Sequence, residues 1–221
     1  MDLYRFFVNN LDTLWPEVQD HLLIVAVTMS VSAVSGVGLG ILASRRARLG
    51  EAILGVASTL LTIPSFALFA VLTTIFIALG STIGDPPVVV GLLLYAQLPI
   101  IRNTRAGILA VNGSVLEAAR GMGMTPRQVL TRVEVPLALP VILGGLRQAT
   151  VMIVAITTVG ATVGSNNLGR PILNALERSG SNLPIIAGTM LVAAIGIGAD
   201  ALLGLLQRVL SKGRITAERT A

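Results

Sequence analysis

The sequence predicts an all-α membrane protein with five transmembrane helices. Hydrophobic residues make up 53% of the 221 residues and charged residues only 12%, whereas soluble domains carry about a quarter charged residues. The mean hydropathy is +0.83. Because the chain has 23 glycines and only 4% aromatic residues, its apolar mass is aliphatic and small, which is typical of helices that pack closely in lipid.

Five apolar segments reach or approach the roughly 20 residues that a helix needs to cross the hydrocarbon. They are Leu22–Ser44, Ala52–Leu79, Val88–Leu109, Pro136–Gly164 and Leu183–Leu210. The third is the weakest, because Pro99 interrupts it and Arg102 and Arg105 fall in its last turns, where arginines can extend to the interface. We therefore expect an extracytoplasmic segment at 1–21, a transmembrane domain at 22–210 with a cytoplasmic loop at 112–135, and a cytoplasmic tail at 211–221. Segment 1–21 lacks the basic and apolar regions of a cleavable signal peptide.

Lysine and arginine are distributed unevenly between the two sides that these spans define. Twelve lie on one side: Arg45, Arg46, Arg48, Arg102, Arg105, Arg120, Arg127, Arg132, Arg208, Lys212, Arg214 and Arg219. Three lie on the other side, namely Arg5, Arg170 and Arg178, and Arg147 falls within the fourth span. Because an excess of basic residues marks the cytoplasmic side, we expect the N-terminus outside the cell and the C-terminus in the cytoplasm.

A polar, arginine-rich stretch from Glu117 to Pro140 separates two apolar runs and predicts a short helical hairpin. Ser114 with Glu117, and Thr125 with Gln128, have the spacing of capping boxes, so two short helices are expected to begin near Val115 and Pro126.

Glycine and proline shape the rest of this hairpin. Gly121 and Gly123 remove side chains where the chain must turn or be approached closely, and Pro136 is expected to end the second helix.

The spacing of this stretch resembles the EAA loop of permeases in ATP-binding-cassette importers. The motif is carried by Glu117, Ala118, Ala119, Gly123, Val133, Val135 and Pro136. The resemblance implies the fold of a type I importer permease, whose loop inserts into a groove of a cytoplasmic ATPase. It also implies ATPase-coupling roles, which we assign to Glu117, Ala118, Ala119, Gly121, Gly123 and Pro136. The alternative is that Glu117 only caps its helix, and both can hold together.

No residue pattern in the chain predicts catalysis. It has a single lysine and no Gly-rich loop ending in Gly-Lys-Ser/Thr, so ATP and Mg²⁺ are expected on a partner ATPase and no cofactor is expected on this chain. It has no cysteine and one histidine, His21, expected to be an exposed residue of the membrane interface. A metal site and an enzyme activity are therefore not expected. The net charge of +5 is explained by the membrane-side bias and does not indicate nucleic acid.

Three further stretches resemble permeases that import glycine betaine, choline, carnitine and related osmoprotectants. They are Thr62–Leu68, Leu98–Thr104 and Gly160–Gly169. The resemblance implies three kinds of partner in the membrane complex: a pair of cytoplasmic ATPases, a second permease that is identical or paralogous, and an extracytoplasmic substrate-binding protein. An importer for another small solute, such as methionine, and a passive channel or structural membrane protein remain the alternatives.

Several polar or helix-breaking residues within the spans are candidates for the solute path: Pro64, Ser65, Pro99 and Asp200. Prolines free backbone carbonyls that can line a cavity, but a kink that improves packing is an equal alternative. An acid in a long apolar run needs a partner or a pathway, so Asp200 is expected to serve either hydrogen bonding or transport. Small residues at helical spacing, including Gly36, Gly40 and Gly204, are expected to serve packing.

Overall fold

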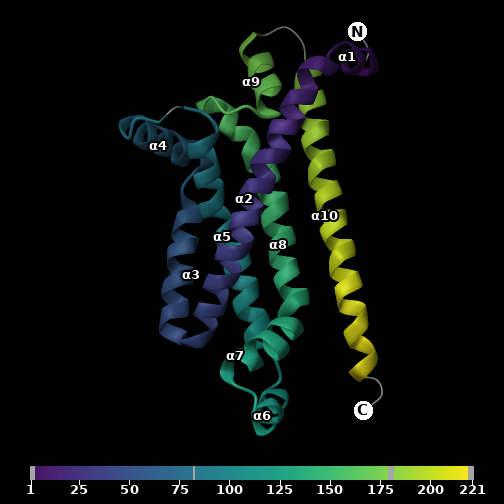
Figure 1. Cartoon of the computed structure of the whole chain (residues 1–221). Helices are drawn as coiled ribbons and strands as arrows, with labels where there is room; N and C mark the ends of the chain where they lie inside the picture. The colour runs from purple at the N-terminus through teal and green to yellow at the C-terminus, as the bar shows by residue number, and fades with distance from the viewer. Residues whose placement is uncertain (1–2, 82, 179–181, 219–221) are drawn as a thin grey trace.

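The computed structural model describes residues 3–81, 83–178 and 182–218, and within these ranges it contains helices and connecting turns but no strand. Figure 1 shows a long bundle. Its α-helices are α1 (Leu3–Asn9), α2 (Leu11–Arg45), α3 (Ala47–Thr62), α4 (Ser65–Ala78), α5 (Asp85–Leu109), α6 (Gly113–Gly121), α7 (Pro126–Val129), α8 (Val135–Thr157), α9 (Gly169–Arg178) and α10 (Leu183–Glu218). A π-helical turn, η1 (Leu130–Glu134), precedes α8, and a 3₁₀ turn, η2 (Thr158–Val163), follows it.

Three helical stretches of the described chain are long and apolar enough to cross a membrane: Leu11–Arg45, Pro126–Val163 and Leu183–Leu210. The α3–α4 pair makes a fourth if its two halves count as one broken span. Helix α5 corresponds to the weakest predicted span and lies along the same axis (Figure 1). Helices α1 and α9 lie at one end of the bundle, and α6 and α7 lie at the other, where α10 also ends.

The second predicted span is not one continuous helix. Helix α3 ends at Thr62, Ile63 and Pro64 are extended, and α4 leaves at an angle of 97°. Proline lacks an N–H and disfavours a helical residue before it. The carbonyl of Ile63 accepts a hydrogen bond of 2.6 Å from the buried Tyr95 hydroxyl of α5. The break is thus stabilised by a partner that no local pattern reveals.

Helices α2, α5 and α8 form the centre of the bundle, and they pack on one another directly. Buried aliphatic residues from all three meet Phe69 of α4 in one continuous apolar cluster. The helices approach closely because glycine occupies the contact positions. A Cβ added to Gly36 would lie 2.7 Å from Ile100, and one added to Gly145 would lie 2.8 Å from the carbonyl oxygen of Pro99. The small-residue stripe of α2 therefore packs against α5, as the sequence predicts.

The expectation that His21 is exposed was wrong, because its side chain is fully buried. Helix α2 begins at Leu11, so His21 lies well inside a helix rather than in an extended outer segment. It shares one face of α2 with the buried Thr28 and Ser32, since residues seven and eleven apart lie on the same side of an α-helix. The tail expected at 211–221 continues α10 as far as Glu218, and 219–221 lie outside the described residues.

We expect Gly40→Ala to weaken the α2–α5 contact. Its new Cβ would lie 2.4 Å from Thr104 Cβ, an atom that side-chain rotation cannot move, so the two helices must separate. Overpacking of this kind costs about 1–3 kcal/mol. The matched control is Gly38→Ala, whose Cβ meets nothing within 4 Å. Thermal unfolding of the purified variants in detergent measures the difference, and equal melting temperatures would contradict the packing role.

Candidate functional site

The loop that connects α5 to α8 contains two short helices, α6 and α7, and most of its residues are exposed. Its first helix, α6, begins at Gly113 and is capped by Asn112, whose Oδ1 accepts hydrogen bonds from the Ser114 N–H at 3.0 Å and from the Ser114 hydroxyl at 2.9 Å. The predicted capping box of Ser114 and Glu117 was therefore wrong. Asparagine is at least as good an N-cap as serine, and it starts the helix two residues earlier. Glu117 is not needed as a cap, and its side chain is exposed.

The second helix of the loop begins as predicted. Thr125 accepts a hydrogen bond from the backbone N–H of Gln128, and the Gln128 side chain accepts one from the backbone N–H of Thr125 at 2.8 Å. This reciprocal pair fixes the start of α7 at Pro126. Between the helices, Gly123 has a φ of +81°, a conformation that residues with a side chain rarely adopt. Gly121 ends α6 with an ordinary φ and open space around it.

The prediction that Pro136 ends the second helix was wrong. The helical path runs unbroken from Pro126 through η1 into α8 and η2. In η1 the chain follows a π-helical pattern, with the Val135 N–H donating to the carbonyl of Leu130. A π-turn holds one extra residue, and Pro136 follows it directly, so the missing N–H falls where the hydrogen-bond pattern changes from π-helical to α-helical.

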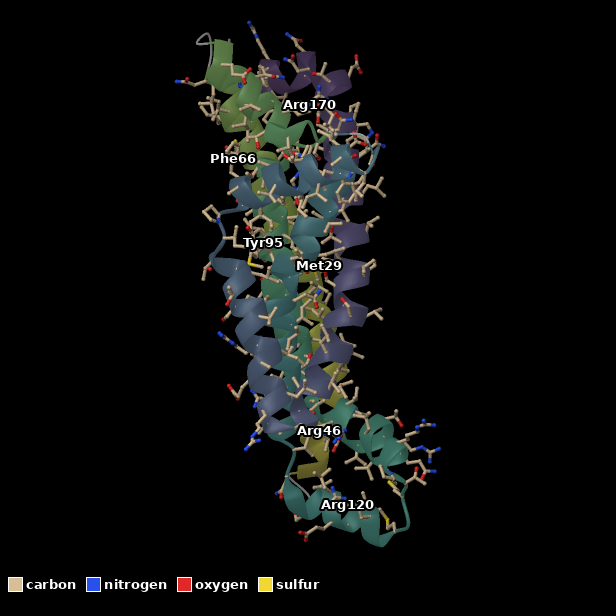
Figure 2. The ribbon with its side chains drawn as sticks, turned by 90° about the vertical axis from the view of Figure 1, so that its left-hand side faces the viewer. Met29, Arg46, Phe66, Tyr95, Arg120 and Arg170 are labelled. Atoms are coloured by element: carbon tan, nitrogen blue, oxygen red, sulfur yellow. The ribbon has the colours of Figure 1, made fainter. Side chains whose placement is uncertain are left out.

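The predicted coupling residues occupy different parts of this loop. Glu117, Ala118, Gly121 and Gly123 are exposed near its tip, where Figure 2 labels the neighbouring Arg120. Ala119 is 2% exposed and faces inward. Pro136 lies apart from them at the base of α8. The exposed members and Met122, which is 72% exposed, thus offer a small, mixed polar and apolar surface at one end of the bundle.

An ion pair that the sequence did not predict joins this region to α2. Glu134, the last residue of η1, is buried, and its carboxylate accepts hydrogen bonds from both terminal nitrogens of Arg45, the last residue of α2. The separation of 89 residues along the chain hid the pairing from any local pattern. The one signal was an acid directly before the apolar run that follows the polar loop.

Asp200 has a partner on α8. Its carboxylate accepts two hydrogen bonds from Arg147, of 2.9 Å from Nε and 2.7 Å from Nη2. Arg147 Nη1 also donates to Gln207 at 3.1 Å, and Gln207 in turn donates to the carbonyl of Pro140 at 2.8 Å. Gly204 leaves room for the guanidinium, because an added Cβ would lie 3.1 Å from its central carbon. Asp200, Gly204 and Gln207 form one face of α10, and we call this cluster the α8–α10 clamp.

The other path candidates lie on different elements from Asp200. Pro64 and Ser65 lie at the α3–α4 break, and Pro99 is buried inside α5. Helix α10 packs on α8 and α9, whereas α3 and α4 pack on α5, and Figure 1 shows α3 and α10 on opposite sides of the bundle. A single chain thus does not gather these four residues into one site.

The opposite end of the bundle holds a polar loop and a cavity. Ser165 donates a hydrogen bond of 2.7 Å to Asp85 at the start of α5, and the Asn166 N–H donates to the same oxygen. A cavity of about 440 Å³ lies between α1, α2 and α9, beside the ion pair of Glu17 and Arg170 at 3.6 Å. Within the described ranges, no group of three or more His, Cys, Asp or Glu residues is placed to hold a metal ion.

Comparison with known proteins identifies relatives over almost the whole chain. Residues 36–212 match the family model described as "binding-protein-dependent transport system inner membrane component". An osmoprotectant import permease protein of Salmonella typhimurium is 40% identical over 211 residues, covering 96% of this chain and 98% of that protein. A choline transport system permease protein of Bacillus subtilis is 38% identical, covering 95% and 90%.

The fold also matches a solved structure. A methionine ABC transporter in an inward-facing conformation aligns with a TM-score of 0.82 at 21% identity, covering 90% of this chain and 97% of that chain. At this identity the match shows a shared fold.

We expect Asp200→Asn to lower the melting temperature while leaving import measurable, because the amide still accepts a hydrogen bond but no longer balances the Arg147 charge. Replacing both partners, Arg147→Met with Asp200→Leu, should recover part of the lost stability, since no unpaired charge remains. Glu51→Gln is the control, because it makes the corresponding acid-to-amide change at an acid that pairs with an arginine but whose own side chain is 72% exposed. An Asp200→Asn complex of unchanged stability that imports nothing would contradict the clamp role and assign Asp200 to the solute path.

Proposed function

The chain belongs to the family of binding-protein-dependent transport system inner membrane components, and from that membership we propose that it is the permease subunit of an ATP-driven importer for osmoprotectants. Its solute would be glycine betaine, choline, carnitine or a similar quaternary ammonium compound. The observation that carries this proposal is 40% identity to an osmoprotectant import permease over nearly the full length of both proteins.

In this proposal the chain is a transport subunit, and hydrolysis of ATP takes place on a separate ATPase pair. Closure of that pair would push on the exposed tip of the α6–α7 loop. Because α7, η1 and α8 form one unbroken helical path, a push at the tip would move α8 directly. ATP and Mg²⁺ would bind to the ATPases, and this chain would convert their movement into alternating access.

Solute recognition would rest mainly on an extracytoplasmic binding protein. Quaternary ammonium ions are held by cages of aromatic faces, and this chain has one tryptophan and two tyrosines. Of these, Tyr95 is buried with its hydroxyl on Ile63, while Tyr4 and Trp15 are exposed near the N-terminus. The permease would offer a weak, transient passage.

The solute path would form between this chain and a second permease, identical or paralogous. Pro64, Ser65, Pro99 and Asp200 remain our candidates along that path. These residues lie on different elements of one chain and do not form one site there. Residues of the partner subunit would therefore have to complete the lining of the path.

The second candidate function is import of another small solute by the same machinery. Similarity of fold to a methionine transporter favours it, but the sequences of the osmoprotectant relatives are much closer. Binding of radiolabelled choline, glycine betaine and methionine to the cognate binding protein, followed by uptake into proteoliposomes that contain the whole complex, decides between the two. Methionine uptake without betaine or choline uptake would overturn the osmoprotectant proposal.

We also propose five membrane passes, with α1 outside the cell and the α6–α7 loop in the cytoplasm. The chain has no cysteine, so single cysteines can be labelled without background. Thr13→Cys should react with a membrane-impermeant thiol reagent in intact cells, and Met122→Cys should react only after the membrane is opened. Labelling of Met122→Cys in intact cells would reverse the orientation.

The coupling loop is tested by Gly123→Leu and Glu117→Lys. A side chain at the positive φ of Gly123 strains the turn by about 1–2 kcal/mol, and both changes alter the exposed tip, so we expect normal membrane insertion but weaker capture of the ATPase and reduced uptake. Gly113→Ala, with open space around its Cβ, and Asp12→Lys, at the other end of the bundle, are the controls. If both test variants keep full ATPase capture and uptake, the loop does not couple the subunits and the passive-channel alternative returns.

A further inference from the structure

The loop helices α6 and α7 are attached to the bundle mainly through η1. In the described chain they pack on each other and on η1, and η1 packs on α8. Apart from the short connection of α6 to α5 at residues 110–112, a force applied to the loop tip therefore enters the bundle at residues 130–134. The spanning helices that move with the loop are those that η1 contacts.

Among the residues that the structure describes, the pair of Arg45 and Glu134 is a directional contact that joins α2 to η1. The Glu134 side chain is 5% exposed, while the Arg45 side chain is 42% exposed. Arg45 Nη1 donates to Oε1 at 3.1 Å, and Nη2 donates to Oε2. A guanidinium that engages both oxygens of a carboxylate fixes orientation as well as distance. Glu134 is thereby held in place although it is nearly removed from water.

Glu134 is the last residue of the π-turn η1. A residue in an α-helix is rotated by about 100° from the one before it, so the extra residue of a π-turn changes which face each following residue presents. Leu130, at the start of η1, packs against a buried apolar cluster of Ile108 of α5 with Ala138 and Ile142 of α8, and residues of α2 pack against the same cluster. Apolar contacts of this kind are non-directional, whereas the ion pair resists sliding.

We propose that Arg45 and Glu134 form the link through which a movement of the loop reaches α2, so that α2 and α8 move as one unit. The inference rests on the proposed coupling function of the loop, and it assigns positioning roles to two residues outside the exposed tip. Without the link, the loop would still bind the ATPase and move α8, but α2 would follow less closely, because only its non-directional packing on α5 and α8 would remain. ATP would then be hydrolysed with little import.

The test variant is Arg45→Met combined with Glu134→Gln, which removes the link without leaving a buried carboxylate unpaired. Arg45→Lys keeps the charge but loses the two-pronged contact. Arg46→Met is the matched control, because Arg46 is the exposed neighbour at the same end of the bundle (Figure 2) and its change of type and charge is the same. Each chain is purified with its ATPases, combined with the binding protein and placed in proteoliposomes.

We expect the double variant to retain the ATPases and its melting temperature, and to import about tenfold less solute per ATP hydrolysed, within the range of coupling energies between sites. Arg45→Lys should fall between it and the unmodified chain, and Arg46→Met should match the unmodified chain. A double variant that imports at the unmodified ratio overturns the inference. One that loses the ATPases or melts far earlier also overturns it, because the pair then serves folding. An unmodified complex that captures no ATPase or imports nothing overturns the proposed function and the inference together.

Discussion

The absence of water in the hydrocarbon is the constraint on which this structure depends. A polar group inside a bilayer needs a protein partner, because no solvent can replace one. The clamp between α8 and α10 meets that need for Asp200 and Arg147, and Tyr95 meets it for the carbonyl of Ile63. These contacts also decide how the helices are arranged. Few of the described side chains of α10 are buried, so the polar residues that face α8 help to position it, together with apolar contacts of Val192 and Ile195 with the core.

The same constraint explains why the prolines have different effects. Pro99 and Pro140 remain inside helices, Pro64 separates two helices at 97°, and Pro136 follows a π-turn. Proline always removes one donor, but what happens next depends on which neighbouring group can satisfy the freed carbonyls. At Pro64 a hydroxyl from α5 is available, and at Pro136 a local change of helix type absorbs the defect.

Features that depend on local rules could be predicted from the sequence, whereas contacts between residues far apart in the chain could not. The capping box of Thr125 and Gln128 and the need for glycine at position 123 follow from local rules, and the structure bears them out. Of the five apolar segments, three lie in helices long and apolar enough to span a membrane, and the second is broken at 97°. The start of α6 was missed because Asn112 competes with Ser114 for the same cap. The burial of His21 was missed because its acidic neighbours suggested an exposed segment, whereas the contacts of α2 with α5 and α8 decide which face is buried. For Arg45 and Glu134, the local sequence shows an acid before an apolar run but gives no sign of which residue that acid pairs with.

Two of the ion pairs that connect helices differ in what they can contribute. Arg147 and Asp200 lie near the middle of α8 and of the apolar part of α10, where separating the charges would expose both to hydrocarbon, so this pair is suited to holding two helices together permanently. Arg45 and Glu134 lie at helix ends, and half of the pair is accessible to solvent. Water can stabilise the arginine if the pair opens, but the buried Glu134 carboxylate would lose its partner, so the pair sets a definite geometry. An interaction of that kind suits a point where movement is transmitted, because it determines direction without making the bundle rigid.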